Sequence, residues 1–275
     1  MPQNSDNRKR AFADVVTIDG WHASFSAETS KVDLHADVVF GYARLGGEPD
    51  APVRFRLSIK RAEMVVVIPD FEPVSVDRSS VSRDTPERQG RLTETVERSA
   101  QAAARGNLAG SLSQSGLTGS ASSEASAQAT MSSSKKLEVS ATVQFMIVTQ
   151  SQTAEGYYRW LIEPGTARTL QGRPWDPAKQ PRLKLVDRRT DPSKGIPPTV
   201  RLEVRCRRED LEIEDLEVKD ESLWENVKAR AGFKNRIAAA ESYIRLRLLE
   251  EGLEAGNIHD PFGQLTLGSV SAEST

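Results

Sequence analysis

The sequence predicts an α+β protein that is mainly antiparallel β, with a sandwich-like arrangement of its strands. Three observations lead to this prediction. Short segments in which apolar and polar residues alternate recur in both halves of the chain, as expected of strands that bury one face. A low-complexity Gly/Ala/Ser insertion separates the two groups of strands, and a long amphipathic helix follows near the C-terminus.

The first group of strands lies between residues 11 and 83. Apolar residues alternate with polar ones from 53 to 59, which predicts a half-buried strand. Residues 64–68 are continuously apolar, as in a strand that is buried on both faces. Residues 32–42 are rich in β-branched and aromatic types, and residues 74–81 alternate weakly, as an edge strand does.

The segment from 11 to 25 holds apolar residues on both sides of Asp19-Gly20. Asp and Gly are favoured in turns because both tolerate backbone angles that other residues avoid. The segment therefore predicts a strand, a tight turn and a return strand.

A helix and a low-complexity segment interrupt the strands at residues 84–135. Pro86 in the first turn and an apolar residue every three or four positions predict a helix that ends at Gly106. Of the 29 residues from 106 to 134, 19 are Gly, Ala or Ser. Such a composition offers little apolar surface to bury.

Three interpretations of residues 106–134 remain open. Gly and Ser are costly to order, which favours a flexible linker, whereas the Ala-rich part from 121 to 131 favours a continued helix. Small and hydroxylated residues also alternate here, as in a membrane-inserting β-hairpin that gains a lipid-facing side only in an oligomeric barrel. In that case residues 85–150 rearrange into the hairpin. The residues expected to enter the membrane are Leu108, Leu112, Leu117 and Met131.

The second group of strands occupies residues 136–220. Apolar and polar residues alternate from 136 to 150 and from 200 to 206, and each segment predicts a half-buried strand. Further strands are expected at 157–162, 182–186 and 211–218, the last with a bend near Glu214-Asp215.

The C-terminal helix is predicted to begin at Ser222, because Glu225 three residues later completes a capping box. An apolar stripe that includes Ile237, Ile244 and Leu248 predicts that one side of the helix packs on a sheet. The opposite side of the helix is basic. The remaining residues predict one short strand and then disorder.

Together these elements predict one composite domain that the insertion interrupts. Strands on both sides of the insertion are half-buried, so each group needs the other to complete a core. The parts in order are a disordered N-terminus at 1–10, the first part of the β-rich domain at 11–83, the helix and Gly/Ala/Ser-rich insertion at 84–135, the second part of the β-rich domain at 136–220, a C-terminal helical segment at 221–256 and a tail at 257–275.

The composition argues against several classes of protein. The 37 basic and 39 acidic residues nearly cancel, so no overall field favours nucleic acid or an anionic membrane. Cys206 is the sole cysteine, which excludes an intramolecular disulfide and fits a reducing compartment. No apolar run approaches the roughly 18 residues that span a bilayer as a helix. We therefore expect a cytoplasmic protein.

The residues that could carry chemistry form no established catalytic or cofactor motif. The three histidines lack metal-ligand spacing, and the sequence contains neither a P-loop nor a nucleophile elbow. On a strand, Asp33, His35 and Asp37 share one face, and His22 would join them from a paired strand. The acids at 209–217 alternate with apolar residues, which is typical of a solvated strand face. No cofactor is expected, and an enzyme with a carboxylate-based site remains a second alternative.

The sequence favours a non-enzymatic binding or assembly protein whose partner is another protein or a second copy of itself. Its contact surfaces would be sheet edges, the aromatic strand at 157–162 and the C-terminal amphipathic helix. The first alternative is a membrane-active or pore-forming protein, and nucleic acid is not expected as a partner. The residues predicted to line a binding surface are Tyr157, Tyr158, Trp160, Arg54, Arg56, Arg201 and Arg205.

Overall fold

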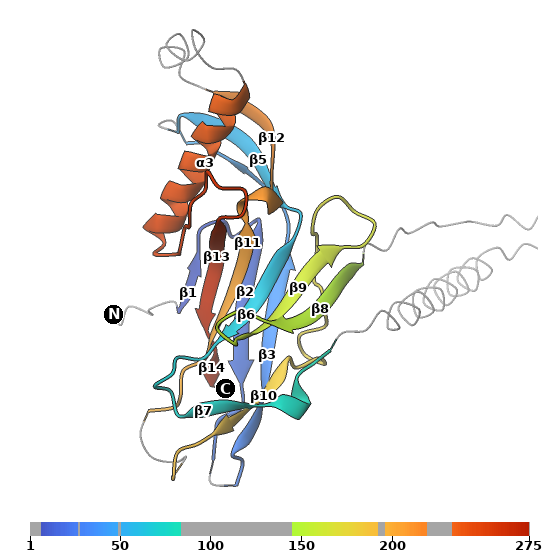
Figure 1. Ribbon diagram of the computed structural model, residues 1–275, viewed down its shortest axis with the longest axis vertical. Coiled ribbons are helices and arrows are strands. Elements are labelled where there is room, and N and C mark those ends of the chain that lie inside the picture. The colour runs from blue at the N-terminus through green and yellow to red at the C-terminus, as the bar shows by residue number, and fades with distance from the viewer. Residues whose placement is uncertain are drawn as a thin grey trace, which may run out of the picture. The chain divides into compact units, whose positions relative to one another are not determined.

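In the computed structural model, the described residues are 7–26, 28–48, 51–83, 145–191, 196–218 and 233–274, and they form mostly antiparallel strands with one α-helix near the C-terminus (Figure 1). This arrangement confirms the predicted fold class. The Gly/Ala/Ser-rich insertion lies outside the described residues, and so do Leu108, Leu112, Leu117 and Met131. The described strands before and after the insertion belong to one compact unit, which comprises Met1–Thr85 and Gln144–Thr275.

Three sheets make up this unit. Sheet A has the strand order β1 (Arg8–Arg10), β13 (Gln264–Ser271), β11 (Arg201–Arg207), β6 (Ala62–Val67), β9 (Tyr158–Pro164) and β8 (Met146–Gln152). Sheet B has the order β14 (Glu273–Ser274), β2 (Val16–His22), β3 (Lys31–Phe40), β10 (Leu183–Asp187) and β7 (Val74–Asp77). Sheet C has the order β12 (Leu211–Val218), β5 (Val53–Ile59) and β4 (Ala43–Leu45). Among the described strands, only β14 and β2 pair in parallel.

Sheets A and B pack against each other where β2 crosses β1, β13 and β11. A Cβ atom placed on Gly20 of β2 would lie 2.3 Å from Cδ1 of Leu202 in β11, and one placed on Gly268 of β13 would lie 3.2 Å from Cγ2 of Ile18. A side chain at Gly20 would require Leu202 to move, and one at Gly268 would crowd Ile18. The two glycines therefore set how closely these parts of the sheets approach.

The predicted turn at Asp19-Gly20 is wrong. Strand β2 continues through both residues and pairs without interruption along β3, with Asp19 opposite Asp37 and Gly20 opposite Ala36. The glycine serves the inter-sheet contact with Leu202 instead of a change of chain direction.

Sheet C is joined to sheet A at two places in the chain, where β5 leads into β6 and where β11 leads into β12. The helix α3 (Phe233–Glu250) packs on β12 and β5, beside which Figure 1 draws it. Ala240, Ile244 and Leu248 are buried on the packed side, as the predicted apolar stripe requires. Tyr243 meets the ring of Phe55 edge-on, with 5.8 Å between the ring centroids. The predicted start of the helix at Ser222 lies outside the described residues.

Several predicted strands are confirmed with small changes of their ends. Strand β5 occupies 53–59 as predicted, and β6 is buried on both faces over most of its length. The bend predicted in β12 is present, because the register with β5 shifts between Glu214 and Glu217 and Asp215 has a φ of 50°. A positive φ is uncommon outside glycine and marks an irregular strand.

The first described residues form a strand that the sequence does not predict, and β13 near the C-terminus is longer than the short strand that the sequence predicts. Residues Arg8–Arg10 form β1 instead of a disordered end, and they pair with β13. The predicted tail holds β13, an internal strand of sheet A between β1 and β11. Leu265, Leu267 and Val270 are buried in it, and these three residues are too few and too irregularly spaced to predict a long strand from sequence.

Trp160 lies in the core and not on a surface. Its side chain is fully buried within β9, and its indole Nε1 donates a hydrogen bond to the carbonyl oxygen of Ser82 at 2.9 Å. A buried indole with a satisfied N–H contributes both apolar area and a specific polar contact.

Replacing Trp160 with Ala is expected to lower the free energy of unfolding by about 3–5 kcal/mol, because the change leaves a large cavity and an unpaired carbonyl. Urea denaturation followed by circular dichroism measures the loss. Phe71→Ala is the control: Phe71 is 84% exposed, so a change within about 0.5 kcal/mol is expected. Equal effects of the two substitutions would contradict the core position of Trp160.

Candidate binding surface

The four arginines predicted to line a binding surface lie in two sheets. Arg201 and Arg205 belong to β11 of sheet A, whereas Arg54 and Arg56 belong to β5 of sheet C. The pairing partners of β11 are β13 and β6, and those of β5 are β12 and β4. The structure therefore does not bring the two pairs together on neighbouring strands.

Carboxylates neutralise much of this basic character. Glu203 accepts from Arg201 at 2.6 Å and from Arg205 at 2.7 Å, and only 7% of its side chain is exposed. The guanidinium of Arg56 lies 4.1 Å from the centre of the Tyr42 ring and 4.0 Å from Glu214. A surface compensated in this way exerts little net attraction on a polyanion.

The aromatic strand offers less surface than the sequence predicts. Tyr157 and Tyr158 are half-buried, and Tyr158 packs against the core. Because Trp160 is buried, this strand presents no row of three exposed rings for stacking.

The sequence predicts that His22 joins Asp33, His35 and Asp37 from a paired strand, and the pairing of β2 with β3 shows that it does not. Trp21, and not His22, lies opposite His35, so His22 points to the other face of sheet B, where it is buried. The ring of His35 stacks on Trp21 with 5.3 Å between centroids, and its Nδ1 lies 2.9 Å from the carbonyl oxygen of Pro177. Asp37 accepts from Arg173 at 2.8 Å, so it faces a cation and not the histidine.

Most of the acids at 209–217 are likewise paired with cations. Glu212 contacts Lys60 at 2.7 Å and also binds Arg168, and Asp210 contacts Arg61 at 3.2 Å. Among the described residues, no three His, Cys, Asp or Glu side chains are grouped so that they could hold a metal ion.

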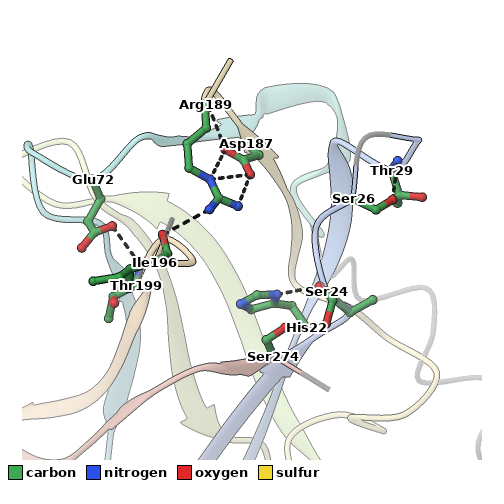
Figure 2. A network of polar contacts seen from close by, with 11 residues as sticks. His22, Ser24, Ser26, Thr29, Glu72, Asp187, Arg189, Ile196, Thr199 and Ser274 are labelled. Carbon is green, nitrogen blue, oxygen red and sulfur yellow. Dashed lines mark hydrogen bonds and ion pairs between the residues drawn. The ribbon is translucent and has the colours of Figure 1, made fainter. Parts of the chain in front are cut away.

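A network of polar contacts joins several loops near the ends of β2 and β10 (Figure 2). Asp187 ends β10 with its side chain fully buried, and Arg189 donates to it from Nη2 at 2.7 Å and from Nε at 3.0 Å. Arg189 also donates from Nη1 to the carbonyl oxygen of Ile196 at 3.2 Å. In the same view, Ser24 and Ser274 meet through their hydroxyls at 2.8 Å, so the C-terminal strand is tied to the end of β2. The bond from Arg189 to Ile196 thus joins the residues just after β10 to a residue that precedes β11.

Burial raises the pKa of Asp187, but the hydrogen bonds from Arg189 outweigh burial, and the pKa lies below its ordinary value of 3.8. A carboxylate whose pKa is lower in the folded than in the unfolded state stabilises the fold above its unfolded-state pKa. This contribution is lost as the pH falls through the folded-state pKa.

We expect Asp187→Asn to be less stable than the wild type at neutral pH, and the difference to shrink as the pH falls below 3.8. Urea denaturation at a series of pH values measures both proteins. Asp70→Asn is the control, because Asp70 is exposed in a turn. A difference that stays constant with pH would show that the charge of Asp187 does not stabilise the fold.

Two adjoining hollows open on the outer face of sheet A and share Arg61 and Asp210. One has a volume of about 330 Å³ and lies over β6, β9 and β11, with Arg159 and Arg205 in its lining. The other has a volume of about 500 Å³ and reaches Ile147 at the start of β8. Burial raises the pKa of Asp210, and the nearby Arg61 opposes this shift.

Cys206 lies in the lining of the smaller hollow, but its thiol is buried. Burial raises the pKa of the thiol, since the thiolate is poorly solvated there. Cys206 should therefore behave as an inert core residue.

We expect the thiol of Cys206 to stay unreacted with Ellman's reagent while the protein is folded. One thiol per chain should react after unfolding in guanidinium, because Cys206 is the sole cysteine. Rapid reaction of the native protein would indicate that sheet A opens locally at β11.

Strand β8 is the terminal strand of sheet A, next to β9. Just before β8, the N–H of Gly165 donates to the carbonyl oxygen of Phe145 at 3.0 Å; just after it, the N–H of Thr153 donates to the carbonyl oxygen of Tyr157 at 2.9 Å. In an antiparallel pair, successive residues point alternately toward and away from the partner strand. The odd-numbered residues of β8 therefore bond to β9, and no described strand lies on the other side. The residues whose N–H and C=O groups point away are Met146, Val148, Gln150 and Gln152.

The other edges of the described sheets are each blocked. Strand β1 consists of Arg8, Lys9 and Arg10, and β14, β7 and β4 have two, four and three residues. Strand β12 is long, but it carries four carboxylates and a register shift. The part of β3 beyond β10 is covered by a loop, since Trp175 donates to the Ala36 carbonyl at 2.7 Å. Charge, shortness, bulges and cover are the devices that prevent unwanted strand pairing.

Within the described part of the chain, β8 shows none of these devices. Its seven residues, MIVTQSQ, include no charge and no proline, and its register with β9 has no shift. Arg159 of β9 donates from Nε to the Ser151 hydroxyl at 2.8 Å and so holds β8 in place. The sequence predicts a strand at 136–150, of which 136–144 lie outside the described residues. Its predicted alternation places Ile147 on the buried face, but Ile147 is exposed and Val148 is buried. The edge position becomes known only from the pairing of all strands.

Comparison of the chain with models of known protein families, with curated proteins and with solved structures found no match. Within the described part of the chain, no helix combines the length and the apolar character needed to cross a membrane.

Proposed function

We propose that this chain is a non-enzymatic binding or assembly protein of the cytoplasm that takes up an extended polypeptide segment as an added strand along β8. The observation that carries the proposal is the β8 edge, which is regular, uncharged and seven residues long. Strand addition gains affinity from main-chain hydrogen bonds and selectivity from side-chain pockets beside the edge. Both elements are available here.

The outer face of sheet A beside β8 supports the selectivity of such binding. Ile147 is 38% exposed and lines the larger hollow together with Glu163 and Arg61. Alternate side chains of an added strand would lie beside Ile147, Thr149 and Ser151 on this face. A segment with β-branched or apolar residues at alternate positions fits this row.

The C-terminal helix is the other contact surface that the sequence predicts. Its apolar stripe is used to cover sheet C, where Ala240 and Ile244 are buried. The side that remains exposed includes Arg245, Leu246 and Leu249. This mixed surface is less suited than β8 to bind a partner by regular contacts.

The non-enzymatic part of the proposal is supported by the separate contacts of the groups that could act in catalysis. His35 is held between Trp21 and the Pro177 carbonyl, whereas Asp187 is held by Arg189. The cytoplasmic part is supported by the free thiol of Cys206, which fits a reducing compartment.

Selection of phage-displayed random peptides against the full chain tests the proposal. Peptides that bind should lose about tenfold or more of their affinity for Gln150→Pro, because proline removes an outward N–H without breaking the bonds to β9. Gln150→Val is the matched control, since it changes the same side chain but keeps the N–H, and it should bind as the wild type does.

The selected peptides should also slow amide hydrogen exchange of β8 in the wild-type protein. Peptides that bind Gln150→Pro and the wild type equally, with no protection of β8, would refute strand addition at this edge.

A further inference from the structure

We propose that the segment that pairs with β8 is β8 of a second copy of this chain, antiparallel to the first about a twofold axis at Thr149. This inference rests on the proposed function, because it names the partner for the same edge. It joins two copies of sheet A into one continuous sheet with an isologous interface.

The spacing of the outward backbone groups supports the twofold register. Met146, Val148, Gln150 and Gln152 lie symmetrically about Thr149 in the strand. When Thr149 faces Thr149 of the second copy, Val148 faces Gln150 and Met146 faces Gln152. Every outward N–H then meets an outward C=O of the second copy. A shift of two residues in either direction leaves one outward residue on each strand without a partner.

The charge pattern also fits a second copy. In a twofold pair, a charged residue near the axis lies close to the same residue of the second copy. Like charges opposite each other destabilise a sheet. From Phe145 to Thr153 the strand and its flanks carry no charge, whereas the similarly long β12 carries Glu212, Glu214 and Glu217. Of these two long edges, only β8 can therefore face itself without repulsion.

The side chains on the outer face of β8 also fit the twofold pair. Thr149 is exposed, and it would face its own copy as a non-hydrogen-bonded pair, a position in which threonines pair well. Ile147 would face Ser151 of the second copy and would be covered by the added strand. On the inner face, the half-buried Gln150 would lie beside Val148 of the second copy.

Disulfide trapping tests both the partner and the register. The variant Thr149→Cys, made in a Cys206→Ala background, should form a disulfide-linked dimer under mild oxidation with copper phenanthroline. The reason is that directly opposed residues of a non-hydrogen-bonded pair have Cα atoms about 4.5 Å apart, which is within the disulfide range of about 4.4–6.8 Å. Thr149 is exposed, so the change should leave the fold intact, which circular dichroism checks.

Two further variants serve as controls for the register. Ile147→Cys alone and Ser151→Cys alone should not form linked dimers, because each residue would lie roughly 13 Å from its own copy. A mixture of the two variants should form a linked heterodimer, since Ile147 faces Ser151. Light scattering of the wild type over a range of concentrations should show dimers, and Gln150→Pro should raise the dissociation constant about tenfold or more.

The possible failures are distinguishable. If Thr149→Cys gives no linked dimer and the protein stays monomeric, but selected peptides still protect β8, self-pairing is wrong and strand addition stands. If β8 is protected in the monomer and no peptide binds, a segment of the same chain covers the edge and both proposals fail. Linked dimers of Ile147→Cys alone would overturn the register at Thr149.

Discussion

The close approach of sheets A and B at β2 is the constraint on which the rest of this fold depends. Gly20 and Gly268 have no side chains, and Leu202 and Ile18 fill the space that these glycines leave. Because β2 contacts β1, β13 and β11, this contact positions both termini of the described chain on the sandwich. Interiors are packed at nearly crystalline density, so even one added methyl group at Gly20 would force the sheets or Leu202 to move.

In a sandwich of open sheets, the edge strands have unpaired backbone groups that can pair with other strands. Here the solutions differ from strand to strand: basic residues on β1, a bulge with carboxylates on β12, and a covering loop on β3. Unpaired backbone groups at an edge are satisfied by water at little cost, but they also serve as a template for another strand. Among the described edges, β8 is the one that has no such device, and the proposal that an added strand pairs with it rests on this difference.

The charges of this chain are compensated locally as well as overall. Glu203 lies between Arg201 and Arg205, and Asp187 is held by Arg189 in the network of Figure 2. Pairs of this kind add modestly to stability, but breaking one leaves a charge without its partner in a poorly solvated place. They also leave the outer surface without a strong field, which is consistent with recognition by backbone pairing.

The sequence by itself determined the fold class, the strand at 53–59, the doubly buried β6, the irregularity of β12 and the packed stripe of the C-terminal helix. Periodicity reports these features because burial of one face imposes its repeat on the local sequence. Only the tertiary structure decided that Gly20 serves an inter-sheet contact, that Trp21 faces His35, that β13 is internal and that β8 is an edge. Each of these depends on which distant segments lie side by side, and a local sequence pattern does not specify which strand it pairs with.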